Sequence, residues 1–365
     1  MPEVALAGFA FSGDFEAGKQ RFFHSLAYEQ QLKASGKPIY ANMLQAIEQN
    51  PPQNFKLVRQ IDELRGRDQA IAVALLISAE TVSVERIAGF HKLFVLIRGQ
   101  VLFFDFKLMT VVRSYPISFG NVHVLDRAPS QIEIAERVRL VYEGYEGKPG
   151  IITRFANTLT SASLPTQVSR FLQVTKVDIK PEAMKVLPQY ISRDVNSAQT
   201  WAADIVSEAL STRAGVPIIP FAKGYAVGNV LPLRVSDGRV YDLQLPKPDY
   251  EITAEFSDFR KIKFSESVAG TNYIYGSYAT MRIEEPLTGK VYFNSSLKNG
   301  ESKSVPVTQT YVDDFPAYYD SINRLFVKLA ESIDGKVHQD WLKSAAGPDI
   351  HQHITNTKEL FKLCK

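Results

Sequence analysis

The sequence predicts an α+β protein made of two similar units, each a mainly antiparallel sheet covered on one face by helices. Two observations support this prediction. Segments rich in β-branched and aromatic residues follow one another as in a meander, and each group is followed by a stretch with helical apolar spacing. The order strand, helix, short strand, meander and helix occurs twice in the 365 residues. A chain of this length usually forms about two domains.

The first unit is expected to span residues 1–164. Its second helix has an apolar stripe of Met43, Leu44 and Ile47, and it ends at NPP because proline cannot continue a helix. Its last helix begins at Ser130, which is placed to cap the first turn. The expected elements are a strand at 4–11, helices at 20–35 and 39–50, a short strand at 55–60, a meander at 69–119 and a helix at 130–144.

Residues 143–169 are expected to link the two units. The stretch begins with EGYEGKPG, whose glycines and proline favour turns, and it continues with a segment rich in Ser and Thr. The sequence FANTL could add a short helix. We place the boundary near Leu164.

The second unit is expected at 165–340, followed by a polar C-terminal tail at 341–365. VLFFDFKLMTVV (101–112) can be placed over MRIEEPLTGKVY (281–292) without a gap, at an offset of 180 residues, so the unit is interpreted as a structural repeat of the first. The expected elements are a strand at 170–179, a helix at 196–215 capped by Asn196 or Ser197 and ended by Gly215, a strand at 216–221, an inserted segment with a turn at 236–239, a meander at 250–295 and a helix at 313–335.

Residue alternation predicts which faces of the strands are buried. In YEITAEF (250–256) apolar and polar residues alternate, as in a strand covered by helices on one side only. The longest apolar run, AIAVALLI (70–77), has the length of a strand. In EEPLTGK, Pro286 and Gly289 stand where a turn needs a fixed and a positive φ, so this segment is expected to join two strands tightly.

Composition excludes several classes of protein. The 42 basic and 39 acidic residues nearly balance, and no run of five like charges occurs, which argues against nucleic acid as a partner. No stretch approaches 18 apolar residues, so no membrane-spanning segment is expected. Cys364 is the only cysteine, which excludes an internal disulfide. MPEVALAGFAFSGDF lacks the features of a signal peptide. We nevertheless expect a periplasmic or envelope protein, in which Met1 stands in place of a removed leader. The alternative is a cytoplasmic protein.

Few residues are candidates for chemistry. His351 and His353 in DIHQHI would share one face of a strand and could bind a metal, with His338 and Asp340 as further ligands if the tail folded back. A solvated terminal helix or loop is the favoured interpretation. No third ligand lies nearby in sequence. We therefore expect neither a metal nor another cofactor.

Candidate catalytic residues are equally sparse. His91 and His123 flank strands and could act as general bases if a carboxylate lay within hydrogen-bond reach; ordinary strand-end histidines are the alternative. Glu284 and Glu285 are adjacent on a strand, so they point to opposite faces and belong in a solvated turn. No nucleotide-binding, nucleophile-elbow or zinc-protease motif occurs. The chain is therefore not expected to be an enzyme.

Tyrosines form the most prominent candidate interaction surface. Tyr273 and Tyr275 share one face of a predicted strand, Tyr278 lies on the other face, and Tyr292 follows the turn. Exposed tyrosines among Ser, Thr and Asn suit protein contact or carbohydrate stacking. Cross-strand packing within the sheet is the alternative.

The second unit resembles a domain of bacterial envelope proteins. The resemblance rests on RIEEPLTGKVYF (282–293), SINRLFVKLAESI (321–333) and VPIIPF (216–221). These segments are similar to the periplasmic domain of the curli secretion lipoprotein CsgG, the amino-terminal domain of TolB and the penicillin-binding-protein activator lipoproteins. The resemblance implies a lipoprotein-like adaptor or assembly part. The chain departs from the pattern because it has two fused units and no amino-terminal lipidated cysteine, and no functional residue is carried over.

These observations define two hypotheses. The first is a non-catalytic cell-envelope protein that contacts other envelope proteins, or further copies of itself, through exposed sheet edges or aromatic faces. The second is an enzyme or small-ligand-binding protein with its site in the cleft between the two units.

Overall fold

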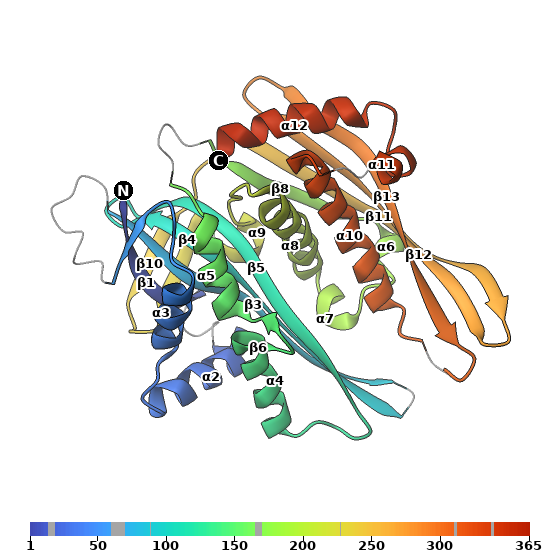
Figure 1. Cartoon of the computed structure of the whole chain (residues 1–365), viewed down its shortest axis with the longest axis horizontal. Coiled ribbons are helices and arrows are strands. Elements are labelled where there is room, and N and C mark those ends of the chain that lie inside the picture. The colour runs from blue at the N-terminus through green and yellow to red at the C-terminus, as the bar shows by residue number, and fades with distance from the viewer. Residues whose placement is uncertain are drawn as a thin grey trace. The chain divides into compact units, whose positions relative to one another are not determined.

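The chain forms two compact units, shown in Figure 1. The structure is a computed structural model and describes residues 1–13, 19–59, 70–87, 89–164, 170–226, 228–309, 312–336 and 339–365. Unit 1 comprises residues 1–169 and 225–246, and unit 2 comprises residues 170–224 and 247–365. In both units helices pack on a sheet dominated by antiparallel pairs, which confirms the predicted α+β class.

Unit 1 contains a seven-stranded sheet in the order β2-β1-β3-β4-β5-β10-β9. The long strands β3, β4 and β5 form the antiparallel meander, and β1 pairs in parallel with β2 and β3. A further pairing of β9 with β1 closes the circuit of strands. The strands are β1 (Glu3–Ser12), β2 (Lys56–Val58), β3 (Ile71–Ile87), β4 (Phe90–Asp105), β5 (Thr110–Leu125), β9 (Val230–Val235) and β10 (Val240–Gln244).

Helices cover one face of this sheet. Their buried apolar residues, among them Met43, Val138 and Phe155, pack against the inward side chains of β1, β3 and β4. Ser130 caps α4 through a capping box with Glu133, as the sequence predicts. The helices are α2 (Phe23–Ala34), α3 (Ile39–Gln49), α4 (Gln131–Glu143) and α5 (Ile151–Ser161), with the short strands β6 (Gly144–Tyr145) and β7 (Lys148–Pro149) between the last two.

The hairpin of β9 and β10 belongs to unit 1. Assigning residues 225–246 to the second unit is therefore wrong. The hairpin has an apolar face of Leu231, Leu233, Tyr241 and Leu243, all buried. The ring of Tyr241 lies 6.1 Å from that of Phe104, on the sheet face opposite the helices. The expected turn at 236–239 is present, with Gly238 at φ 92°.

Unit 2 contains a four-stranded sheet in the order β13-β12-β11-β8. Again three long antiparallel strands form a meander, and β8 pairs in parallel with β11. Ile219 forms a parallel bridge to Gln173 beside β8, in the place that β2 takes beside β1. The strands are β8 (Leu172–Ile179), β11 (Tyr250–Ser267), β12 (Gly270–Glu285) and β13 (Lys290–Pro306).

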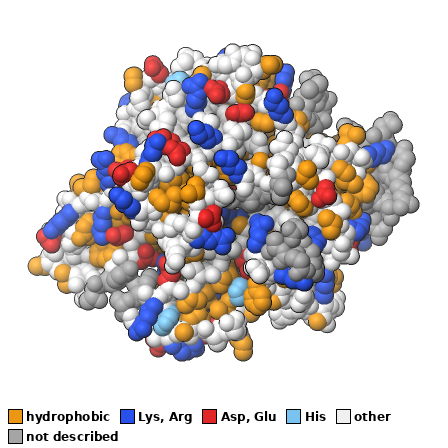
Figure 2. Space-filling view, turned by 180° about the vertical axis from the view of Figure 1, so that it is seen from behind, with side chains coloured by type: hydrophobic (Ala, Val, Ile, Leu, Met, Phe, Trp, Pro, Cys, Tyr) orange, Lys and Arg blue, Asp and Glu red, His pale blue; other side chains and the backbone are white. Residues whose placement is uncertain are grey.

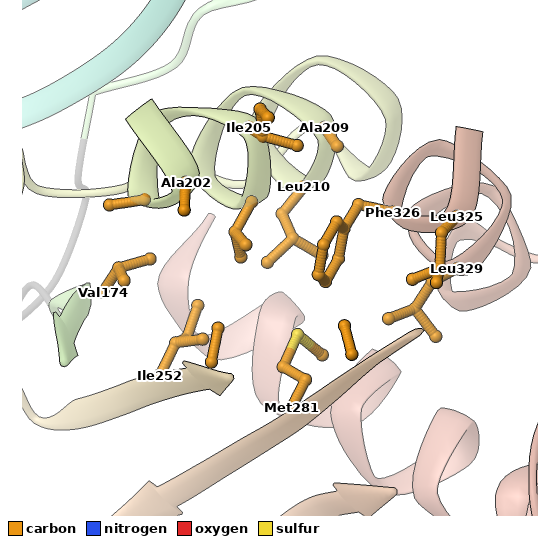
Figure 3. Close-up of a cluster of buried hydrophobic side chains, with 14 of the residues drawn as sticks. Val174, Ala202, Ile205, Ala209, Leu210, Ile252, Met281, Leu325, Phe326 and Leu329 are labelled. Atoms are coloured by element: carbon orange, nitrogen blue, oxygen red, sulfur yellow. The ribbon is translucent and has the colours of Figure 1, made fainter. Parts of the chain in front are cut away.

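Two long helices pack on the inner face of this sheet. Figure 3 shows Leu210 of α8 and Phe326 of α10 facing Met281 of the sheet. The cap of α8 is Asp194, and not Asn196 or Ser197 as predicted, while Gly215 ends the helix at φ 65°. The helices are α6 (Pro181–Met184), α7 (Gln189–Ser192), α8 (Val195–Ala214), α9 (Ala222–Tyr225), α10 (Phe315–Asp334), α11 (Gln339–Ala345) and α12 (Ile350–Cys364).

The C-terminal segment is part of the unit 2 core, so the expected polar tail at 341–365 is wrong. Leu360, Phe361 and Cys364 of α12 are buried in the same cluster as α8 and α10. Trp341 of α11 donates a hydrogen bond through Nε1 to Oδ1 of Asn299 at 3.0 Å. The segment reads as polar because apolar residues occupy only one stripe of α12.

The two sheets have matching irregularities. Register shifts leave Val112 in β5 and Tyr292 in β13 as extra residues, and these positions are 180 residues apart. Four-residue loops join β4 to β5 and β12 to β13, and the fourth loop residue has positive φ in both, at Met109 (50°) and Gly289 (71°). Two further pairs of matching bulges lie at Ser78 and Ser257, and at Ala7 and Thr175.

Candidate interaction surface

The two C-terminal histidines lie on a helix and not on a strand. They lie on α12, where residues two apart point about 200° from each other, so the strand interpretation of His351 and His353 is wrong. The ring of His353 packs 5.6 Å from that of Phe293. No group of three His, Cys, Asp or Glu side chains placed to hold a metal occurs within the described ranges. His338 lies outside the described residues.

His91 and His123 lie on β4 and β5 without the geometry of a general base. His123 shares a hydrogen bond with Arg137 at 3.2 Å, and its pKa is lowered first by burial and then by the Arg137 charge. The Nδ1 atom of His91 is buried without a hydrogen-bond partner in the part of the chain that is described. Among the described residues neither histidine is hydrogen-bonded to the carboxylate that a general base requires.

Glu284 and Glu285 accept hydrogen bonds from residues of their own hairpin. Arg282 donates through Nε to Glu284 at 2.7 Å, and the hydroxyl of Thr288 donates to Glu285 within the turn. Their side chains therefore stabilise the β12–β13 hairpin, which agrees with the prediction of a turn.

The candidate tyrosines fall into two groups. Tyr275 is 1 % exposed and donates a hydrogen bond to Asp314 at 2.6 Å, so it is excluded as a surface residue. Tyr273 and Tyr292 are half-buried against the core, each with a lysine over its ring, at 4.4 Å from Lys261 and 4.5 Å from Lys290.

Tyr278 lies on the opposite sheet face, beneath the guanidinium of Arg260 at 5.0 Å. It keeps its place among the candidate contact residues, because it is only partly buried. Its neighbours on that face of β12 are polar toward the β12–β13 turn, at Thr280 and Arg282, and apolar toward the hairpin tip, where Ile274 pairs with Ile262.

A Lys–Asp–Tyr cluster fixes the meander to the start of α10. The Nζ of Lys261 donates to both carboxylate oxygens of Asp314, at 2.8 and 3.1 Å, beside the Tyr275 bond. Burial and then Asp314 raise the pKa of Tyr275, so its hydroxyl stays protonated and serves as a donor. Sequence reasoning missed this cluster because its members are far apart in the chain.

The sheet of unit 2 has a polar outer face, opposite α8 and α10. The register places Thr253 beside Arg282 and Arg282 beside Asn294, in one row across three strands. We define the outer face by its side chains, which are half-buried or exposed: Glu251, Thr253, Glu255, Tyr278, Thr280, Arg282, Asn294, Ser296 and Lys298.

Strand β13 forms an open edge of this sheet. It pairs with β12 along one side, and no strand of the described ranges pairs with its other side. The edge is 17 residues long, without an internal proline. Alternate backbone N–H and C=O groups of such an edge point outward and require hydrogen-bond partners.

Exposed apolar residues accompany the same meander. Near the tip of the β11–β12 hairpin, Ile262 and Phe264 are 50 and 70 % exposed, and Val268 is fully exposed. In Figure 2 basic side chains are interspersed with acidic and hydrophobic ones.

No helix within the described parts of the chain has the length and apolar character needed to cross a membrane. No protein-family model and no curated protein matches the chain. Solved structures similar to parts of it include a minor lipoprotein from Acinetobacter baumannii, with 12 % identity over 46 % of this chain and 89 % of that chain and a TM-score of 0.23.

Another is a PelC dodecamer from Paraburkholderia phytofirmans, with 12 % identity over 45 % of this chain and 85 % of that chain and a TM-score of 0.21. A third is a hypothetical protein from Chlamydia trachomatis, with 13 % identity over 47 % of this chain and 99 % of that chain and a TM-score of 0.24. Likeness of this size carries no conclusion about the activity or partners of this chain.

Proposed function

We propose that this chain is a non-catalytic interaction protein of the cell envelope, in which unit 2 binds a partner protein along the open edge of β13. The observation that carries the proposal is the 17-residue strand without a second neighbour in the described ranges. Strand addition would satisfy its outward backbone groups, and the adjoining outer face would provide side-chain specificity. The envelope location rests on the sequence resemblance given above.

The charge of the edge favours a different protein as the partner over a second copy. Lys290, Lys298 and Lys303 lie along β13, against one acidic residue, Glu301. Lysines on an edge strand oppose pairing with an identical edge, because like charges would meet. An extended segment with acidic residues is therefore the better match.

We further propose that the two units are copies of one ancestral unit. The same strand order, the three pairs of bulges and the offset of 180 residues between the β4–β5 and β12–β13 hairpins support this origin. An enzyme with a site between the units is the weaker hypothesis, because His123 is bonded to Arg137 and not to a carboxylate.

Site-specific photocrosslinking in cells of the source organism tests the partner proposal. A photoreactive residue at Lys298, beside the edge, should yield a discrete protein adduct, and the same residue at Ile132 of α4 should not. Because N–H groups alternate in direction, one of Ser302→Pro and Lys303→Pro removes an outward donor and the other removes a donor to β12. The variant that lacks the outward donor should abolish the adduct. Equal adducts at Lys298 and Ile132, or an adduct insensitive to both prolines, would refute the docking edge.

Cell fractionation tests the location separately. We expect the protein in the periplasmic or membrane fraction. Recovery only with cytosolic proteins would contradict the envelope assignment and leave the docking edge untouched.

A further inference from the structure

Unit 1 contains a gap in the pairing of β1. On its outer side, β1 pairs with β2 from Glu3 to Ala5 and with β9 from Ala10 to Ser12. Between these stretches the carbonyl of Phe9 accepts a hydrogen bond from the N–H of Ser236 at 2.9 Å, and residues 6–8 have no strand partner on that side among the described residues. A bulge at Ala7 and the positive φ of Gly8 (107°) lie in this gap. The chain here has the form of a short, interrupted sheet edge.

A hollow of about 420 Å³ lies over this gap. Its floor includes Leu6, Ala7 and Gly8, and its apolar walls include Pro38 and Val235. The volume lies in the range of small-ligand pockets, and the apolar lining favours small aliphatic side chains.

Three cationic residues, Lys33, Arg59 and Arg239, and one carboxylate, Asp237, line the same hollow. Arg239 pairs with Asp237 at 2.6 Å, which leaves Lys33 and Arg59 as the cations for a ligand. Lys33 donates to the carbonyl oxygen of Ser236 at 2.7 Å and lies 3.3 Å from Glu29. Arg59 lies 3.4 Å from Glu48 in a pair whose side chains are about two-thirds exposed or more. Exposed pairs of this kind contribute little to stability, so Arg59 can turn to a ligand at small cost.

The hollow also holds a polar atom that needs a partner. The Oγ of Ser236 is buried and has no hydrogen-bond partner among the described residues. A buried hydroxyl without a partner is destabilising, and a hydrogen bond to a ligand would remove that cost.

We propose that this hollow binds the C-terminal carboxylate of an extended peptide. The peptide backbone would add to β1 over residues 6–8, its small apolar side chains would contact Pro38 and Val235, and its carboxylate would meet Lys33 and Arg59. A phosphate ion fits less well, because an inorganic anion cannot satisfy the strand edge. This site is independent of the β13 edge.

Fluorescence anisotropy with the full chain tests the assignment. The probe is a fluorescein-labelled Ala-Val-Ala-Ala peptide, prepared with a free carboxylate and as the amide. We expect saturable binding of the acid and at least tenfold weaker binding of the amide. Lys33→Met and Arg59→Gln should each weaken binding of the acid about tenfold, and Lys298→Gln, in unit 2, should not change it.

Circular dichroism of each variant establishes that it is folded, and Arg59→Gln, at an exposed side chain, is the variant least able to disturb the fold. The absence of saturable binding, equal binding of acid and amide, or indifference to both substitutions would overturn the proposal. Unlabelled peptide should displace the probe. Displacement by acetate or phosphate at that same concentration would also overturn the proposal, because it would show a simple anion site.

Discussion

Units 1 and 2 share a strand order and bulges but differ in the outer face of the sheet. The difference is visible in two corresponding strands. In β3, Ala72, Ala74 and Leu76 point away from the helices and are fully buried, whereas β11 has Glu251, Thr253 and Glu255 in the same register. The β9–β10 hairpin closes the first sheet, and no strand in the described ranges closes the second. Alternate residues of one strand thus decide whether a second layer forms.

Exchanging these outer residues should give the largest effect. Leu76→Glu places a charge at a position that is 1 % exposed, and it should destabilise unit 1 by more than about 3 kcal/mol. The reciprocal Glu255→Leu removes a pair with Lys180 at 2.9 Å between exposed side chains and a hydrogen bond from the hydroxyl of Ser257 at 3.2 Å. It should change the unfolding free energy of unit 2 by less than about 1 kcal/mol.

The two units can be followed separately in such experiments. Both tryptophans, Trp201 and Trp341, lie in unit 2, so tryptophan fluorescence during urea unfolding monitors that unit, and hydrogen exchange of the β3 amides monitors unit 1. Similar losses from Leu76→Glu and Glu255→Leu would show that the outer faces do not differ.

A core truncation tests whether each unit has its own core. Phe326 is fully buried in unit 2 and stacks on Phe256 at 5.7 Å, so Phe326→Ala should cost about 3–5 kcal/mol in the transition seen by tryptophan fluorescence. The exchange of β3 amides should stay at its original rate. Faster exchange in β3 would indicate one cooperative core.

Removal of the Trp341 hydrogen bond tests the docking of the C-terminal segment. In Asn299→Ala, Trp341 and Lys328 lose the Oδ1 acceptor that both share at 3.0 Å, and Ser321 loses the bond from Nδ2. We expect a loss of about 1–3 kcal/mol and faster amide exchange in α11. The control is Lys298→Ala, at the neighbouring position whose side chain points outward. If amide exchange in α11 were unchanged in Asn299→Ala, this hydrogen-bond network would not hold the C-terminal segment.

The sequence could predict the elements and the repeated order because these depend on local patterns. The helix-covered meanders, the Ser130 cap and the 180-residue offset were all visible in the printed residues. Contacts between distant segments were not. The carboxylate of Glu80 accepts hydrogen bonds from the N–H groups of His24 and Ser25 and so caps α2 from another element, and no local pattern reveals such a cap.

The hairpin was misplaced for the same reason. Its apolar face requires a partner face, but alternation within residues 230–244 does not say which sheet provides it. The clue was the run AIAVALLI, whose two apolar faces require two covering layers. The candidate site divides similarly: Tyr278 lies on a polar sheet face as alternation predicts, whereas burial of Tyr275 depends on Asp314, 39 residues away.

The smallest expected effect concerns the cap of α4 in unit 1. Hydrogen bonds from Arg127 and then from Ser130 lower the pKa of Glu133 to about 2. Because its folded pKa is lower than its unfolded one, Glu133 contributes stability that is present above the unfolded pKa and is lost as pH falls through about 2. Carboxyl carbon NMR should show this titration, and Arg127→Gln should raise the pKa. A midpoint near the ordinary value in the unmodified chain would contradict the capping geometry.

Hydrogen exchange along β13 tests most directly whether unit 2 presents an open edge. In the purified chain we predict alternating protection from residue 294 to 303, with every second amide exchanging rapidly, and continuous protection of β12 between its two neighbours. The paired stretch Ala10–Ser12 of β1 should be protected as well. Uniform protection along β13 would show that its outer side is already covered and would contradict the proposed docking edge.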